Sequence, residues 1–194
     1  VRQMQLRALD AYLQSARVSI DDTRRALRKL DARRAHSRAT GALAQLKRAR
    51  EQLLDPVAAL KGVAQDQQAL LSHTAARLAL LSKELTMAGQ EAKQAQEPPA
   101  WLSPDHLAER ESDLVDRTSE VLQRFQAATS APPPDPSAEV DPKAQRALEM
   151  AGKALPFLES TVAAMGLARA SLESDALSPA QEQETEALRH LLRA

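Results

Sequence analysis

The chain of 194 residues contains no cysteine, which excludes disulfide bonds, thiolate metal sites and cysteine nucleophiles. Aromatic residues make up 2% of the chain and glycines number five, so there is little material for loops, and no glycine-rich phosphate loop occurs. No apolar run reaches the roughly 18 residues that suggest a membrane-spanning helix. With so little irregular backbone on which to build a catalytic site, we predict that the protein is not an enzyme.

What the chain does contain favours helices throughout. Alanine, leucine, arginine, glutamine and glutamate are abundant, and these are among the strongest helix formers. Arginine (19 residues) outnumbers lysine (7 residues), a bias that we interpret as that of a GC-rich bacterial genome. A core of alanine and leucine has little volume per residue, which predicts closely packed, thin bundles and no sheet.

Four dipeptides place a short polar residue directly before a proline at the start of a helical pattern. The polar side chain can cap the first free N–H groups, and proline fits the first helical position. The four dipeptides are Asp55-Pro56, Ser103-Pro104, Asp141-Pro142 and Ser178-Pro179. They divide the chain into five helical segments.

The first segment carries an apolar seam that changes phase. Positions spaced alternately by three and four form the seam up to Leu30, and a second seam, offset by one residue, begins at Ala35. The first comprises Leu6, Leu9, Leu13, Ala16, Ile20, Thr23, Leu27 and Leu30; the second comprises Ala35, Ala39, Ala42, Leu46, Ala49 and Leu53. We predict one continuous helix over about 2–54. The alternative is a kink or tight hairpin over 31–41, with Gly41 as a weak breaker.

The fold class predicted is all-α, an elongated antiparallel bundle of about five helices with coiled-coil-like packing. A three-helix core is expected over 1–130, with helices at about 2–54, 56–95 and 104–129. Residues 131–140 form a proline-rich linker that favours extended structure. Residues 141–194 form a helical hairpin that we expect to be truncated at its C-terminal end, with a kink near Gly152 to Leu155 caused by Pro156.

No motif for metal, cofactor or nucleophilic chemistry occurs in the sequence. The four histidines are isolated, apart from His106 with Glu109, a pair that we interpret as solvated. We therefore predict no catalytic, cofactor-binding or metal-binding residues.

Charge is segregated along a chain whose formal net charge is zero. Residues 1–54 contain 13 Lys/Arg against 5 Asp/Glu, a net of +8, whereas residues 98–140 contain 3 against 8, a net of −5. The densest basic cluster is the candidate interaction surface: Arg24, Arg25, Arg28, Lys29, Arg33, Arg34 and Arg38. It is either a solvated face neutralised by the acidic third helix, or a surface for an acidic protein or anionic lipid. Nucleic acid is disfavoured because no aromatic residues are interleaved with the charges.

Two polar residues occupy the apolar seam of the second segment. Gln67 and Thr74 stand where leucine is expected. They are interpreted as polar contacts that set the helix register inside the bundle, or alternatively as the lining of a polar pocket for a small ligand.

The C-terminal pattern, Met165-x-x-Ala168-x-x-x-Leu172 followed after a turn by Gln183-x-x-x-Ala187-Leu188-x-x-Leu191-Leu192, resembles helical hairpins of large bacterial envelope proteins. The resemblance names no family, and it favours a periplasmic or envelope-associated location over the cytoplasm. We predict a non-enzymatic helical interaction or scaffold module, part of a larger bacterial protein, that binds a protein partner or itself. The alternatives are a ligand-sensing bundle, or an anionic-surface binder that contacts a membrane through the basic helix or through flanking segments.

Overall fold

The computed structural model describes residues 2–87, 99–130 and 142–194. This part of the chain is helical throughout and contains no strand, which confirms the all-α fold class. It has six α-helices where about five were expected. The elements are α1 (Arg2–Arg28), α2 (Ala32–Leu53), α3 (Pro56–Met87), the 3-10 helix η1 (Ala100–Leu102), α4 (Pro104–Thr129), α5 (Pro142–Glu173) and α6 (Leu177–Leu191).

The chain forms two compact units, which we call unit 1 (Val1–Ala59) and unit 2 (Leu60–Ala194). Helices α4 and α5 flank the proline-rich segment 131–140 and pack against each other within unit 2. The predicted domains had placed these two helices on opposite sides of a boundary. The linker itself, the end of the second helix at 88–95 and the Asp141 cap lie outside the described residues.

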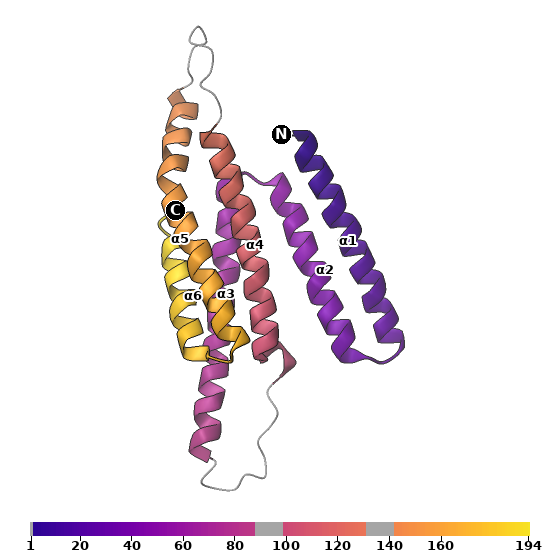
Figure 1. The fold of residues 1–194 in the computed structure, drawn as a ribbon. Helices are drawn as coiled ribbons and strands as arrows, with labels where there is room; N and C mark the ends of the chain where they lie inside the picture. The colour runs from indigo at the N-terminus through magenta and orange to yellow at the C-terminus, as the bar shows by residue number, and fades with distance from the viewer. Residues whose placement is uncertain (1, 88–98, 131–141) are drawn as a thin grey trace. The chain divides into compact units, whose positions relative to one another are not determined.

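Unit 1 is a hairpin of α1 and α2, which lie side by side and antiparallel (Figure 1). The prediction of one continuous helix over 2–54 is therefore wrong, and its hairpin alternative is closer. The break lies at residues 29–31, and Gly41 lies inside α2. The amide of Asp31 donates to the carbonyl of Ala26 (3.0 Å), and Leu30 adopts a left-handed φ of 57°. This is a Schellman turn, in which Leu30 occupies the position that glycine usually fills.

The α5–α6 connection repeats this construction. The amide of Ala176 donates to the carbonyl of Ser171 (2.8 Å), and Asp175 has a φ of 56°. Ala176 then becomes the residue before α6, which has no side-chain cap. The predicted start of the last helix at Ser178-Pro179 is wrong because the Schellman turn allows the helix to begin at Leu177.

The other described helix starts confirm the predicted capping. The carboxylate of Asp55 accepts from the amide of Ala58 (2.9 Å), and the hydroxyl of Ser103 accepts from the amide of His106 (3.3 Å). Asp31, which sequence reasoning did not assign as a cap, accepts from the amide of Arg34 (3.0 Å). Helix α5 continues through Pro156.

Unit 2 is a bundle of α3, α4, α5 and α6 (Figure 1). Helix α5 packs against α4 and α6, and buried side chains of α3 bond to both α4 and α6. Four helices arranged in this way cover one another's apolar faces. The large apolar side chains buried in this unit include Val63, Leu70, Leu107, Leu114, Val121, Leu158, Met165, Leu172 and Leu191.

Replacing Leu30 by glycine should stabilise the α1–α2 hairpin. The left-handed conformation destabilises a non-glycine residue by roughly 1–2 kcal/mol, and the Leu30 side chain is 92% exposed, so little packing is lost. We expect a gain of about 1 kcal/mol after the extra unfolded-chain entropy of glycine is subtracted, measured by thermal or urea unfolding. Asp175→Gly is the matched control and should gain less, because aspartate tolerates this conformation better. A loss of stability in Leu30→Gly would contradict the claim that the backbone of Leu30 is strained.

Candidate functional site

The α1–α2 hairpin is closed by small side chains. Five alanines are buried to 4% exposure or less: Ala16, Ala26, Ala35, Ala42 and Ala49. The three in α2 recur every seven residues and so lie on one face of that helix. Alanine faces let two helices approach closely, but they leave the larger side chains of the predicted seams at the edge of the contact.

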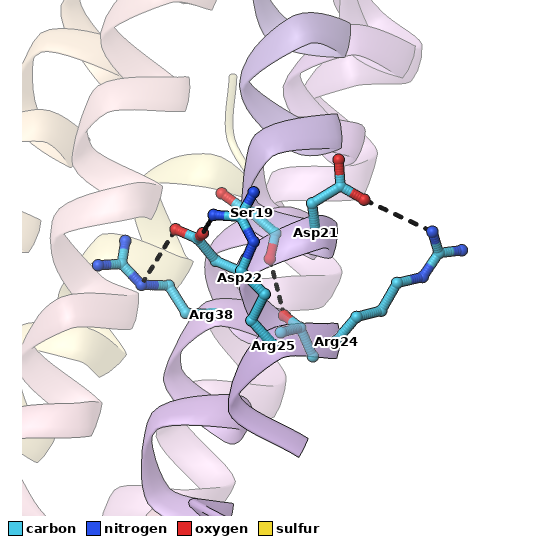
Figure 2. A network of polar contacts seen from close by, with 7 residues as sticks. Ser19, Asp21, Asp22, Arg24, Arg25 and Arg38 are labelled. Carbon is cyan, nitrogen blue, oxygen red and sulfur yellow. Dashed lines mark hydrogen bonds and ion pairs between the residues drawn. The ribbon is translucent and has the colours of Figure 1, made fainter. Parts of the chain in front are cut away.

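One face of the hairpin is polar. Figure 2 shows Asp22 of α1 lying between Arg25 of the same helix and Arg38 of α2, at 3.2 Å from Arg25 Nη1 and 4.0 Å from Arg38 Nε. Arg24 pairs with Asp21 at 3.5 Å (Figure 2). Three of the seven arginines and lysines of the predicted cluster are therefore paired with carboxylates of their own hairpin.

The other four members of that cluster surround the hairpin turn. Arg28 and Lys29 end the α1 side of the turn, and Arg33 and Arg34 begin α2; all four are exposed. Within the ranges that the structure describes, their side chains have no ion pair. The acidic protein or anionic lipid expected to bind these four side chains stays a prediction.

The opposite face of the hairpin is apolar and exposed. Residues seven apart in a helix share a face, and helical geometry places the α1 and α2 sets on the same side of the hairpin, away from the Asp22–Arg38 pair. We call this surface the leucine face. It comprises Leu6, Leu13, Ile20 and Leu27 of α1 with Leu43, Leu46 and Leu53 of α2, each between 36% and 70% exposed. The seams read from the sequence were expected to be buried, but two helices alone cannot cover these side chains.

Unit 2 contains a second cluster, a buried polar layer. Gln67 Nε2 of α3 donates to Glu111 Oε2 of α4 (3.2 Å), and Thr74 Oγ1 of α3 lies 2.8 Å from Glu184 Oε1 of α6. All four side chains have 0% exposure. One oxygen of each carboxylate, Glu111 Oε1 and Glu184 Oε2, has no hydrogen-bond partner among the described residues.

Both carboxyl groups hold their protons at unusually high pH. Burial, and secondarily the neighbouring Glu184 carboxylate, raise the pKa of Glu111 to about 8. Burial raises the pKa of Glu184 to about 7, although the Thr74 hydrogen bond and the Arg110 charge act to lower it. Thr74 Oγ1 also lies 3.3 Å from the carbonyl oxygen of Leu70. The Thr74 hydroxyl donates its one hydrogen to Glu184 Oε1, the nearer of these two acceptors.

Charged groups on α3 and α4 frame this layer. Arg110 contacts Nδ1 of His73, and burial, followed by the Arg110 charge, lowers the pKa of that histidine. The His73 ring also stacks edge-on against Trp101, with centroids 5.0 Å apart. Arg117, which is 2% exposed, pairs with Asp66 (2.8 Å) and with Asp113 (3.5 Å). The α3–α4 contact is thus polar along much of its length.

The structure brings Gln67 and Thr74 into one layer, but against partners that sequence reasoning missed. Glu111 was counted only as part of the acidic third helix, and no role was assigned to Glu184. Their helical positions, in phase with Leu107, Leu114 and Ala187, were a signal that could have revealed their burial. Both predicted residues are hydrogen-bonded inside the bundle; a ligand pocket there stays a prediction.

No cluster of three or more histidine or carboxylate ligands suited to a metal ion occurs in the described residues. Among the same residues, no helix is both long enough and apolar enough to cross a bilayer. No protein-family model, curated protein or solved structure matches the chain.

The buried carboxyl groups predict that unit 2 loses stability as the pH rises. A carboxyl whose folded pKa is raised binds its proton more tightly in the folded state, so the stability it contributes is complete below its unfolded pKa of 4.5 and is lost as the pH rises towards about 8. Glu111→Gln keeps the shape without the charge. At pH 8–9 we expect this variant to unfold at a higher temperature than the wild type, with a free energy of unfolding larger by roughly 1–3 kcal/mol. Its unfolding temperature should also depend less on pH.

Glu109→Gln is the matched control, since Glu109 is exposed on the same helix. Its pH profile should follow that of the wild type. Thermal unfolding from pH 5 to pH 9, followed by circular dichroism, distinguishes the two variants. Identical profiles for both would show that Glu111 is not the titrating group.

Proposed function

We propose that this chain is a non-enzymatic helical scaffold module that self-associates through the leucine face of unit 1. The observation that carries the proposal is the run of seven large apolar side chains exposed on one side of the α1–α2 hairpin. Contiguous apolar patches of this kind mark interaction surfaces, whereas scattered single leucines do not.

A second copy of the hairpin fits this face by length and by chemistry. Two hairpins paired face to face form a four-helix arrangement, which is how unit 2 covers its own leucines. A twofold axis matches each leucine face to an identical surface, the commonest way in which proteins form dimers. Side chains that are already half covered contribute roughly 1 kcal/mol each when they are buried completely, enough for seven per copy to offset an association cost of about 4–15 kcal/mol.

Charge favours the antiparallel version of this pairing. The unpaired cations Arg28, Lys29, Arg33 and Arg34 lie at the turn, and antiparallel hairpins place the two turns at opposite ends of the dimer. Arg24, Arg25 and Arg38 are paired with aspartates of their own hairpin and need no carboxylate from a partner. Some repulsion between two basic hairpins remains, and salt should screen it.

We expect the full chain to dimerise reversibly, with an affinity that strengthens as salt increases from 50 to 500 mM. Sedimentation equilibrium over about 1–100 µM measures this. The double variant Leu13→Gln/Leu46→Gln should weaken the dimer at least tenfold, because two buried apolar side chains are lost. Circular dichroism checks that both proteins remain helical.

Val18→Gln is the matched control. Val18 is 62% exposed on α1, but helical geometry places it away from the leucine face, so its change should leave the dimer affinity unaltered. A chain that stays monomeric at 100 µM, or a dimer that weakens with salt, contradicts the pairing. Equal effects of Val18→Gln and the double variant contradict it as well.

A further inference from the structure

The α1–α2 turn presents an apolar side chain that is almost fully exposed. Leu30 is 92% exposed and stands in the left-handed conformation at φ 57°. Glycine would occupy this position without strain. A leucine that is both strained and unpacked does not stabilise the hairpin, and residues held in this way are concentrated at functional sites.

The surroundings of Leu30 are strongly basic. Arg28 and Lys29 precede it and Arg33 and Arg34 follow it, all exposed and without an ion pair in the described part of the chain. The one nearby acidic side chain, Asp31, accepts the amide of Arg34 as the cap of α2. From residue 24 to residue 38 there are seven Lys/Arg against one Asp.

We propose that this turn, the hairpin tip (residues 27–34), docks on a membrane surface that carries anionic lipid headgroups, with Leu30 inserted at the level of the headgroups. Basic side chains attract anionic headgroups, and a protruding apolar side chain enters the boundary between headgroups and acyl chains. Leu27, which is 57% exposed one helical turn earlier, adds apolar surface beside it.

The cations of the tip and the exposed Leu30 together favour anionic lipid over nucleic acid. Nucleic acid would use the same cations, but proteins that bind single strands without base-specific contacts add aromatic stacking platforms, and residues 24–38 contain no Phe, Tyr or Trp. An exposed leucine in a strained conformation adds nothing to phosphate pairing. The tip shares only Leu27 with the leucine face, and Leu30 and the four cations lie outside that face, so membrane docking does not depend on dimerisation.

The test uses the full chain and sucrose-loaded vesicles of phosphatidylcholine alone or with 30% phosphatidylserine. We expect co-sedimentation with the anionic vesicles only, falling steeply between 50 and 300 mM salt. Leu30→Gly should lower the partition coefficient about tenfold through loss of apolar insertion. Arg33→Gln/Arg34→Gln should lower it by a factor of about 25, at roughly fivefold for each cation.

Two controls keep folding separate from binding. Leu30→Gly relieves the backbone strain and therefore leaves the hairpin folded, which thermal unfolding verifies. Leu192→Ser removes an exposed leucine of unit 2, 74% exposed, and should leave vesicle binding unchanged.

Binding to anionic vesicles that is insensitive to Leu30→Gly would overturn the insertion of Leu30. Failure to bind anionic vesicles, together with retention on a DNA duplex, would assign the basic tip to nucleic acid and overturn the proposal. The dimer affinity measured in parallel shows whether the scaffold function stands independently of either result.

Discussion

A pair of helices can cover only one side of each, and this constraint governs the whole molecule. In unit 1 the side that is covered is made of alanines, which allow α1 and α2 to lie close together. Within unit 1 these two helices leave the leucines beside them exposed. In unit 2 four helices surround a common centre, and the same kinds of side chain are buried. One repertoire of residues thus produces an exposed apolar face in one unit and a closed core in the other.

Closing the four-helix bundle has an electrostatic consequence. Positions that face the centre of unit 2 are removed from water whatever residue occupies them, and the polar side chains buried there include Gln67, Thr74, Glu111 and Glu184. Gln67 and Thr74 supply hydrogen bonds to Glu111 and Glu184, but two neighbouring carboxylates deprived of water favour the protonated form. The raised pKa values follow from the packing. This polar layer links α3 to α4 through the bond of Gln67 with Glu111, and α3 to α6 through the bond of Thr74 with Glu184.

Much of the local structure could be predicted from the sequence, because its causes are local. The helix starts at Asp55 and Ser103 follow from capping chemistry within four residues. The two Schellman turns could not be read in this way: both place a non-glycine residue in a conformation that glycine usually adopts, so the usual signal is missing at Leu30 and Asp175. The last helix consequently begins before its predicted cap, and the first segment turns back where one helix was expected.

The burial of side chains separates most clearly what the sequence determines from what the tertiary structure decides. The amino-acid order alone determined the helical class, the heptad spacing of leucine and alanine, and the concentration of positive charge between residues 24 and 38. Only the tertiary structure decided which side of each helix is covered: Leu6, Leu13 and Leu27 of α1 are exposed, whereas Glu111 and Glu184 are buried. The physical reason is that the spacing of residues defines which side chains share a helix face, but not which element packs against that face. The number of helices packed around a face decides whether its side chains meet water or one another.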